Sequence, residues 1–389
     1  MDILHISLLA GFGAKKKFGM SGGDRIHIEF LNEIKNNKKI TILSTKKGLD
    51  FFKNKGLNDN IKFKIIPFTE FGIFYLDLFF LHIVALLYPL FSFLKFKKYK
   101  IIICASDIFP DFFIGFFISM VFKQKAIFSF FLKASNPLSK KFPYKGIRII
   151  YGSVYYIIQK IIIYLIKIKK DKKIIFASDY ALKYFPKLRK NDYFITYGGI
   201  HSQETNHALQ SIKNKKYECV FVGRFHEQKG VIELIEIWKN VISVNSKYKL
   251  AIIGNGPCEN KMKKLVNKYN LKKNIDFLGF LDGKEKNAIF INSKVFIHPP
   301  IFDTGGMALA EAMSFGIPGV VFDLEGYNFA YPYGIIKVSK YDCQEFSDKV
   351  NYLLNDSNAY EKLSREAYHY ISSWDWKKQA IRYAKFLNN

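Results

Sequence analysis

The sequence predicts an α/β fold with parallel sheets, divided between two domains. Short apolar strands alternate with helical stretches along the chain, which is the pattern of parallel α/β sheets. The length, 389 residues, is sufficient for two domains that each bury a core. The glycine-bearing segment 197–200 and the polar run 201–216 separate the strands into two sets, as a linker does.

The apolar runs give the strands expected in each half. In the first half they are Ile3–Leu9, Ile40–Ser44, Lys62–Ile66, Ile101–Cys104, Ala126–Phe130, Lys173–Ala177 and Tyr193–Thr196. In the second half they are Glu218–Gly223, Lys249–Gly254, Ile275–Leu278, Val295–His298 and Gly319–Phe322. No basic stretch precedes the first run, so we interpret it as a strand rather than a signal peptide. We place the domains at 1–198 and 199–373, and expect residues 374–389 to form a helix that packs back on the first domain.

The composition favours acidic partners. The chain has 60 basic and 33 acidic side chains, a formal net charge of +27, which attracts nucleic acid, anionic lipid or phosphorylated substrates. Its basic residues accompany apolar aromatic runs rather than a discrete polar stripe, so we expect no nucleic-acid partner. The four cysteines have neither CxxC nor zinc spacing, which argues against disulfides and structural zinc and favours a reducing cytoplasm.

Two apolar stretches of the first half indicate contact with a membrane. Residues 71–94 are long enough to span a bilayer, but Asp77 and Pro89 interrupt them and further strands follow. A span would separate the first three strands from the rest of their sheet, so we favour helices packed in the domain or lying partly in a membrane surface. Residues 148–173 combine apolar bulk with lysines, as interfacial helices do; a core helix with a solvated end is the alternative. Four lysines after the first stretch, Lys95, Lys97, Lys98 and Lys100, favour the membrane interpretation.

The segment 294–318 predicts a strand, a glycine-bearing turn and a helix. The strand ends at two prolines, and the helix begins near Gly306 and ends at Gly316. Free backbone N–H groups at the positive end of a helix suit a phosphate or a sugar hydroxyl. Asp303 lies in this turn, and Glu311 lies one helical turn beyond Met307. The simpler role for Asp303 is to cap the helix.

Basic residues and glycines follow the preceding strands. Arg224 ends one strand and Lys229 precedes the next helix, where ligands collect in α/β sheets. Such a pair neutralises a diphosphate, although either residue alone is equally explained as a surface cation. Turns at strand ends contain Gly254 and the pair Gly279 and Phe280. The glycines would let the backbone approach a ring or ribose closely, or they are ordinary turn glycines.

The order of these motifs resembles glycosyltransferase family 4. Gly-Arg-x4-Lys-Gly is followed by Ile-Gly-x-Gly-Pro, by Phe-Leu-Gly, and by Pro-x3-Asp-x-Gly-Gly-x4-Glu-Ala-Met-x2-Gly-x-Pro. The resemblance is specific over 218–323, about a quarter of the chain. It implies the GT-B fold, in which two Rossmann-like domains face each other across a cleft, and a retaining transfer from a nucleotide-sugar such as a UDP-sugar or GDP-sugar.

The resemblance assigns roles to individual residues. Arg224 and Lys229 would bind the donor diphosphate, Asp303 the donor sugar and Glu311 the ribose. The loop Thr304, Gly305, Gly306 and Met307 would face sugar and phosphate. The family usually has glutamate where Asp303 stands, so sugar specificity does not carry over.

The first domain matches the family less closely. Gly22 and Gly23 match a glycine loop near the donor phosphates, although the GxGxxG pattern is absent. Many members carry a histidine near the reacting carbon, but residues 128–135 contain none. Asp107 is a candidate substitute; otherwise the donor phosphate takes the acceptor proton. No Asp-x-Asp occurs, so we expect no donor-bridging metal.

We therefore expect a hexosyl-type retaining glycosyltransferase for glycan or glycolipid assembly, with a lipid-linked or membrane-associated acceptor. We expect it in the cytoplasm, peripheral at the inner face of the cell membrane. The alternative is a catalytically impaired, transferase-like, membrane-bound protein that binds sugar nucleotides. A nucleotide-sugar epimerase fits less well, because the first domain has few acids and histidines.

Overall fold

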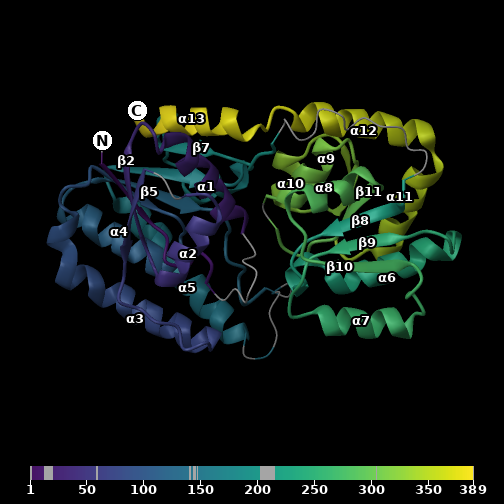
Figure 1. The fold of residues 1–389 in the computed structure, drawn as a ribbon, viewed down its shortest axis with the longest axis horizontal. Coiled ribbons are helices and arrows are strands. Elements are labelled where there is room, and N and C mark those ends of the chain that lie inside the picture. The colour runs from purple at the N-terminus through teal and green to yellow at the C-terminus, as the bar shows by residue number, and fades with distance from the viewer. Residues whose placement is uncertain are drawn as a thin grey trace. The chain divides into compact units, whose positions relative to one another are not determined.

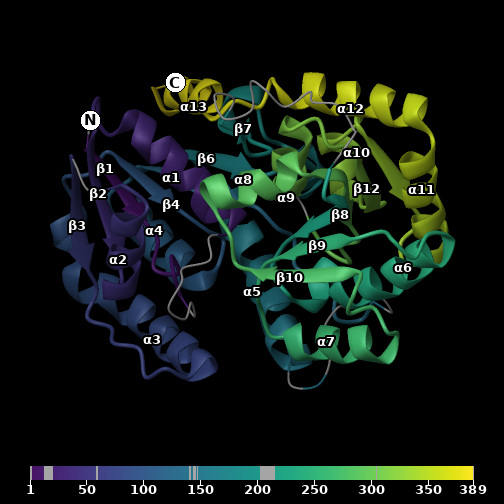
Figure 2. The same cartoon turned by 45° about the vertical axis from the view of Figure 1, so that its right-hand side comes forward.

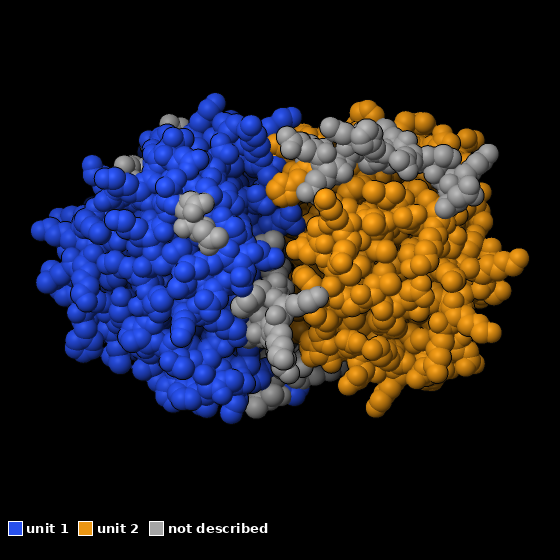
Figure 3. All heavy atoms as spheres, viewed as in Figure 1, with its two compact units in different colours: residues 1–198, 376–389 blue, residues 199–375 orange. Residues whose placement is uncertain are grey.

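The computed structural model divides the chain into two compact units, shown in different colours in Figure 3. Unit 1 contains Met1–Gly198 and Trp376–Asn389, and unit 2 contains Gly199–Asp375. The structure describes residues 2–12, 21–57, 60–139, 142, 146, 148–201, 215–303 and 305–388. The loop 14–20, most of the polar run 201–216 and Thr304 lie outside these ranges.

Unit 1 is built on a parallel sheet with the order β3-β2-β1-β4-β5-β6-β7 in its described part. Its strands are β1 (Asp2–Ile6), β2 (Lys39–Ser44), β3 (Ile61–Ile65), β4 (Ile101–Cys104), β5 (Lys125–Phe130), β6 (Lys172–Phe176) and β7 (Tyr193–Ile195). Its helices are α1 (Gly22–Ile34), α2 (Lys46–Asn54), α3 (Phe74–Ser92), α4 (Phe109–Val121), α5 (Arg148–Ile168) and α13 (Trp376–Asn388). Figure 2 shows α1 and α3 on opposite sides of β1 and β4. The sheet is therefore covered on both faces, as a parallel sheet requires.

The C-terminal helix α13 packs on α1 within unit 1 (Figure 1). The rings of Phe30 and Tyr383 stack with centroids 4.3 Å apart. The ammonium of Lys173 in β6 donates to the carbonyl of Phe386 and lies 4.2 Å from the centre of its ring. Aromatic stacking and a capped carbonyl thus fix the last helix to the first unit.

Unit 2 has a second parallel sheet, with the order β10-β9-β8-β11-β12-β13 among the residues described. Its strands are β8 (Tyr217–Val222), β9 (Leu250–Ile253), β10 (Ile275–Gly279), β11 (Ser293–His298), β12 (Gly319–Phe322) and β13 (Ile335–Val338). Its helices are α6 (Val231–Val244), α7 (Glu259–Lys268), α8 (Gly283–Ile291), α9 (Met307–Ser314), α10 (Glu325–Ala330), α11 (Cys343–Asn355) and α12 (Ser357–Ile371). Two parallel-sheet, Rossmann-like α/β units confirm the predicted fold class.

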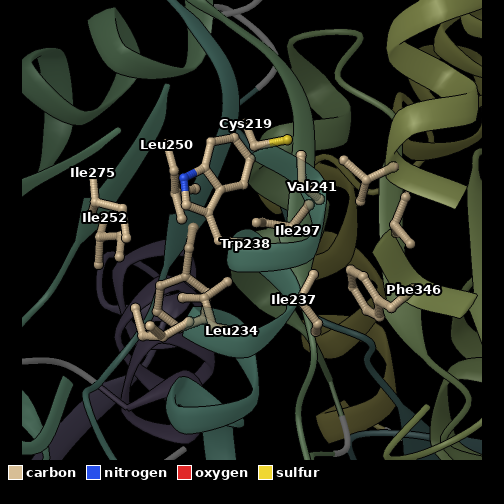
Figure 4. Packing of buried hydrophobic residues seen from close by; sticks show 14 of the residues in the cluster. Cys219, Leu234, Ile237, Trp238, Val241, Leu250, Ile252, Ile275, Ile297 and Phe346 are labelled. Carbon is tan, nitrogen blue, oxygen red and sulfur yellow. The ribbon is translucent and has the colours of Figure 1, made fainter. Parts of the chain in front are cut away.

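The core of unit 2 forms around Trp238 of α6 (Figure 4). Its indole is fully buried among the side chains of β8, β9 and β11. The indole N–H donates to the carbonyl of Asn274 at 3.2 Å, so its polar atom is satisfied while its rings fill the core.

Two segments differ from the sequence prediction. The first strand ends at Ile6 rather than Leu9, because the next residues leave the ladder and the amide of Leu8 donates to Asp111 Oδ1 at 2.7 Å. Strand β13 was not predicted. It lies at the edge of its sheet and is only half-buried along most of its length, so its apolar signal is weak.

Two helices of unit 1 are long and apolar enough to cross a membrane by length and composition. They are Phe74–Phe96, which comprises α3 and the adjoining 3-10 turn, and Ile149–Ile168 in α5. Only 28% and 22% of these segments are buried, whereas the core helix of a soluble protein is mostly buried. Pro89 lies inside α3 without ending it. Large apolar surfaces of both helices thus face outward.

A buried chain of polar groups runs from β1 through α1 to β5. His5 Nε2 lies 3.2 Å from His27 Nδ1, and His27 Nε2 lies 2.9 Å from the Ser129 hydroxyl. Burial lowers the pKa of both histidines, and His27 further lowers the pKa of His5. The pKa of His27 falls to about 4. Both rings are therefore neutral in the folded protein near neutral pH.

This network predicts a loss of stability in mild acid. The unfolded chain takes up a proton on His27 near pH 6.5, whereas the folded protein does so only near pH 4, so the unfolding free energy falls as pH falls through that window. We expect the free energy of unfolding to be roughly 2 kcal/mol lower at pH 5 than at pH 7 because of His27. Urea unfolding of the wild type and of His27→Gln at both pH values measures this difference. The wild type should lose more stability than the variant; equal losses contradict the assignment. The buried Asp107 and Asp111 titrate in both proteins and cancel in the difference.

Candidate functional site

The predicted strand, turn and helix of 294–318 form in unit 2. Strand β11 ends at His298, and α9 begins at Met307. The cap of α9 is Gly306, with φ +51°, and not Asp303, so Asp303 is left for another role. Gly305 and Gly306 complete the turn, and Glu311 lies within α9. Thr304 lies outside the described residues.

Asp303 is the centre of a cluster of hydrogen-bond donors. Lys229 Nζ donates to its Oδ2 at 2.6 Å, and the Tyr327 hydroxyl donates to the same oxygen at 3.0 Å. His298 Nε2 lies 3.3 Å from it. The side chain of Asp303 is only 13% exposed, and that of His298 only 2%. His298 ends β11, Lys229 lies in the turn that follows β8, and Tyr327 lies in α10, which follows β12, so the sheet brings the three groups to its carboxyl edge.

The electrostatics of the cluster keep Asp303 charged. Burial by itself would raise the pKa of its carboxyl, but Lys229 and then His298 lower that pKa well below its usual range. Burial lowers the pKa of His298, against its hydrogen bond to Asp303. Burial and the Asp303 charge raise the pKa of Tyr327 well above its ordinary value. The site is therefore a fixed carboxylate paired with one ammonium and held by a neutral phenol.

The Lys-Gly motif places Lys229 against the turn. A short 3-10 turn, Glu227–Lys229, ends at Gly230 with φ +63°. A Cβ at Gly230 would lie 1.6 Å from the carbonyl oxygen of Pro299. The amides of Ile301 and Phe302 donate to the carbonyl of Gln228 at 2.9 and 3.2 Å. The loop after β8 and the turn after β11 are thus one backbone unit, which requires glycine at 230.

Two tyrosines behind the turn hold it in place. Tyr327 in α10 bonds Asp303 and lies under Gly306, where a Cβ would meet its hydroxyl at 3.0 Å. The hydroxyl of Tyr331 donates to the carbonyls of Gly305 and Gly306 at 2.7 and 2.9 Å. Both phenols are fully buried. The carbonyls of this turn are thus satisfied from the interior of unit 2 by Tyr331.

Glu311 has a basic partner that the sequence did not indicate. Lys286 Nζ in α8 lies 2.8 Å from Glu311 Oε2 and 3.5 Å from Asp282 Oδ1. The side chains of Lys286 and Glu311 are 10% and 16% exposed, so the pair is largely screened from solvent. This pair fixes the direction of the Glu311 carboxylate.

The other predicted donor residues lie at the carboxyl ends of the strands. Arg224 follows β8 with an exposed side chain. The amide of Gly254, after β9, donates to the carbonyl of Gly279, at the end of β10, at 2.8 Å. Phe280 is next in the chain and half-buried. A Cβ at Gly254 would lie 1.9 Å from the carbonyl oxygen of Gly223, so a backbone contact inside the protein explains this glycine.

In unit 1, Gly22 and Gly23 open helix α1. Its N-cap is Ser21, whose hydroxyl accepts from the Asp24 amide, while the Asp24 carboxylate accepts from the Ser21 amide; Asp24 is the third helical residue. A Cβ at Gly23 would lie 2.8 Å from the ring of Phe131. The helix start thus packs on the segment after β5 where the expected histidine is absent.

Asp107 lies in a separate buried cluster of unit 1. Gln159 Nε2 in α5 donates to Asp107 Oδ2 at 2.6 Å, and the Tyr155 hydroxyl lies 3.4 Å away. Gln159 Oε1 accepts from Lys133 Nζ at 3.0 Å and from the Ala134 amide at 2.8 Å. Burial raises the pKa of Asp107 to about 6, although Gln159 opposes this. These bonds explain Asp107 as an anchor between α5 and the loops after β4 and β5.

Four residues of this site in unit 2 are not indicated by the sequence motifs: His298, Tyr327, Tyr331 and Lys286. His298 appears in the sequence as the end of a strand, although a histidine just before two prolines and an acidic turn is a usable signal. Tyr327 and Tyr331 are four apart, the spacing of one helix face, but nothing local links them to residue 303. Lys286 is one of many lysines. Only the tertiary fold distinguishes these residues.

The close approach of Pro299 to Gly230 predicts that alanine lowers stability more at this position than at a glycine with open space around it. Gly230→Ala adds a left-handed backbone cost of about 1–2 kcal/mol and a clash with Pro299. Gly283→Ala is the matched control, because Gly283 has φ +53° and no atom within 4 Å of its Cβ position. Urea unfolding should show a loss several-fold larger for Gly230→Ala. Equal losses contradict the joined backbone.

The hydrogen bond from the Tyr327 hydroxyl to Asp303 predicts that replacing this tyrosine by phenylalanine lowers the stability of the protein. Tyr327→Phe keeps the ring and removes a bond to a charged carboxylate, so we expect about 1.5–3 kcal/mol of lost stability, measured by urea unfolding. Tyr333→Phe, at an exposed position on the same segment, is the control and should change stability little. If the two variants unfold alike, the bond to Asp303 contributes nothing.

The sequence of unit 2 matches known glycosyltransferases. Residues 202–370 match the family model Glycosyl transferases group 1. An uncharacterized glycosyltransferase of Methanocaldococcus jannaschii is 29% identical over 194 residues, 49% of this chain and 46% of its own length. The poly(glycerol-phosphate) alpha-glucosyltransferase of Bacillus subtilis is 23% identical over 186 residues, 43% of this chain and 26% of its own. The chain thus spans less than half the length of these curated relatives.

The fold of the whole chain resembles solved GT-B structures. HepE of Anabaena, in complex with UDP and glucose, has a TM-score of 0.74 at 14% identity, and the match covers 100% of this chain and 99% of that one. WaaG, a glycosyltransferase involved in lipopolysaccharide biosynthesis, has a TM-score of 0.68 at 13% identity, covering 98% of both chains. The chain therefore has the GT-B fold, and its unit 2 matches the family model of group 1 glycosyl transferases.

Proposed function

We propose that the protein is a retaining glycosyltransferase that moves a hexosyl group from a nucleotide-diphospho-sugar to a lipid-linked or membrane-associated acceptor. The observation that carries the proposal is the Asp303 cluster, with its paired Lys229, beside the Glu311–Lys286 pair at the carboxyl edge of the unit 2 sheet. The match of residues 202–370 to group 1 glycosyl transferases supports it, and HepE binds UDP-glucose in a structure of the same fold.

The donor would use the acids and bases of the site in pairs. Lys229 has three N–H donors, of which Asp303 uses one, so its ammonium can also neutralise a diphosphate oxygen. Arg224, exposed at the end of β8, would add a bidentate contact. Asp303 and Glu311 accept hydrogen bonds from hydroxyls, which suits the sugar and the ribose. A diphosphate neutralised in this way needs no bridging metal.

The transfer would proceed on one face of the sugar. As the bond from the anomeric carbon to the diphosphate breaks, the departing phosphate oxygen takes the acceptor proton and the acceptor oxygen bonds to the same face, which retains configuration. The enzyme supplies no nucleophile. Lys229 and Arg224 stabilise the charge that develops on the leaving diphosphate.

The acceptor proposal follows from unit 1. Its helices α3 and α5 present apolar surface outward and carry lysines at their ends, which fits an acceptor held at an anionic membrane. We accordingly place the protein at the cytoplasmic face of the cell membrane, as a peripheral component of glycan or glycolipid assembly. One relative, a phosphatidylinositol N-acetylglucosaminyltransferase subunit of Schizosaccharomyces pombe, is named for a lipid acceptor, and another is a sulfoquinovosyl transferase of Arabidopsis thaliana.

A second candidate function is binding of a sugar nucleotide without transfer. The observation that favours it is in unit 1: the segment after β5 lacks a histidine, and Asp107 is engaged by Gln159. Such a protein would bind the donor through unit 2 and release no product.

Donor binding and turnover test the proposal together. A thermal-shift screen with UDP-, GDP- and ADP-sugars should identify one donor that raises the melting temperature, because a ligand stabilises the state it binds. With that donor, the full chain should release nucleoside diphosphate, faster with a polyprenyl-phosphate acceptor. Lys229→Ala and Glu311→Ala should each lower kcat/KM by about 100-fold or more, because the first removes a cation that stabilises the leaving diphosphate and the second removes the carboxylate that binds the ribose.

The control pair is Glu259→Ala and Lys263→Ala, which removes an exposed ion pair of similar length on α7. Both control variants should keep full activity. Donor binding without release of diphosphate selects the second candidate. Absence of any donor shift rejects both. Proton NMR of the product tests retention, since an inverted anomeric proton contradicts the one-face mechanism.

A further inference from the structure

We propose that the outer faces of α3 and α5 form one docking surface that seats unit 1 on an anionic lipid bilayer without crossing it. This inference deepens the proposed function, because it identifies the surface by which the protein would reach a membrane-bound acceptor.

Helix α5 carries a continuous apolar stripe on its exposed side. The exposed residues recur at intervals of four and three, and each side chain is between 48% and 62% exposed: Ile150, Val154, Ile157, Ile161, Tyr164 and Ile168. The opposite side buries Ile162 and Ile166 in the core. A soluble helix is polar on its outer side, whereas this helix is apolar on both. Its outer side is therefore suited to an apolar environment.

Helix α3 is inverted relative to a soluble helix. Of its buried positions, Leu81 is large and apolar, whereas Asp77, Ala85, Pro89 and Ser92 are small or polar. Its exposed positions are large and apolar: Phe79, Phe80, Ile83, Leu86, Leu87, Leu90 and Phe91, the last 85% exposed. Asp77 is satisfied inside, where it accepts from the amides of Phe71 and Gly72 at 2.6 and 3.1 Å. Water would penalise this arrangement and a lipid phase would favour it.

The two helices belong to one layer of unit 1. The rings of Tyr75 in α3 and Tyr151 in α5 stack with centroids 4.1 Å apart and planes 10° apart. Helix α4 joins the layer beside α3, where His82 stacks on Phe109 at 5.5 Å. Met120 and Val121, at the end of α4, are also half-exposed. The exposed apolar surface is therefore shared by adjacent helices, which exceeds the scattered apolar residues of a monomer surface.

Lysines gather where these helices end. Each helix returns the chain between parallel strands, so α3, α4 and α5 run in one direction and end at the same edge of the sheet. Exposed lysines follow or close each helix there: Lys95, Lys97, Lys98, Lys123, Lys167 and Lys170. No salt bridge joins these lysines to a carboxylate among the described residues. Unpaired cations beside an apolar face match anionic headgroups above acyl chains.

The same geometry excludes a span. Helix α3 links β3 to β4 and helix α5 links β5 to β6, and all four strands belong to one sheet. A helix that crossed the bilayer would place parts of that sheet on opposite sides, which the intact ladder forbids. The net charge of +27 and the clustered lysines also oppose pairing of two copies through this face. An anionic bilayer satisfies both the apolar and the charged parts.

Vesicle flotation of the full chain tests the surface. At low salt the protein should float with phosphatidylcholine vesicles that contain phosphatidylglycerol and bind pure phosphatidylcholine weakly. Phe79→Ser with Phe91→Ser should weaken binding at least about tenfold through lost apolar burial. Lys95→Gln, Lys97→Gln and Lys98→Gln together should weaken it on the order of 100-fold on mixed vesicles.

Matched controls lie in unit 2. Val244→Ser changes an apolar side chain that is 62% exposed, and Lys264→Gln with Lys272→Gln and Lys273→Gln removes exposed lysines. Neither control should change flotation. All variants should keep the melting temperature shift with the donor, while Lys229→Ala should lose that shift and still float. A failure of donor binding is thereby distinguished from a failure of the docking surface.

The depth of α3 in the bilayer distinguishes a helix that lies on the membrane surface from one that spans the membrane. Ile83 is exposed near the middle of the segment Phe74–Phe96, so in an Ile83→Trp variant lipids brominated near the headgroup should quench the new fluorescence more than lipids brominated near the chain ends. Stronger quenching from the deep position, or retention in membranes after alkaline carbonate, indicates a span and overturns the proposal. So does a soluble dimer that dissociates on Phe79→Ser with Phe91→Ser, if the wild type ignores anionic vesicles.

Discussion

The ion pair between Lys229 and Asp303 is the interaction on which the candidate site depends. It joins the loop after β8 to the turn after β11, and the hydrogen bonds to the Gln228 carbonyl make the two segments one backbone unit. A carboxylate in this largely buried place would be costly alone. Lys229, His298 and Tyr327 offset that cost from three directions, so the charge is both retained and oriented. A site with its charges fixed before a ligand arrives reorganises little when one binds.

Glu311 and the glycine turn are likewise held by side chains of neighbouring elements. Lys286 orients Glu311, and Tyr331 occupies the carbonyls of Gly305 and Gly306. In each case a largely buried side chain from a neighbouring element forms a hydrogen bond with the group. We propose that the rest of the group contacts the donor. The second unit thus concentrates its polar order at one edge of a sheet, above an apolar core centred on Trp238.

Unit 1 distributes its polar and apolar groups differently. Its buried polar groups, among them His5, His27 and Asp111, connect strands and helices inside the fold. Its outer helices carry the aromatic and aliphatic bulk that a soluble protein would bury. The inversion is clearest in α3, where aspartate lies inside and phenylalanine outside. Composition alone marked this stretch as apolar, but a buried core helix and a surface helix have the same composition, so only the packing separates them.

Much of the fold was predictable because local signals agreed. The alternation of apolar strands and helical stretches, and the break near residue 200, gave the α/β class and most strands to within a few residues. The edge strand β13 was missed because a half-buried strand has little apolar contrast. The sequence by itself also determined the turn, since two prolines end β11 and glycine is required at 306. What it left open was whether Asp303 capped the helix or faced a partner.

The tertiary structure decided that question. Lys229, His298 and Tyr327 lie 74, 5 and 24 positions from Asp303, and the parallel sheet brings them to one oxygen. No spacing rule connects such residues, because the strand ends meet in space and not in sequence. The structure likewise decided that the apolar helices face outward, since burial is a property of the assembled layer and not of a segment.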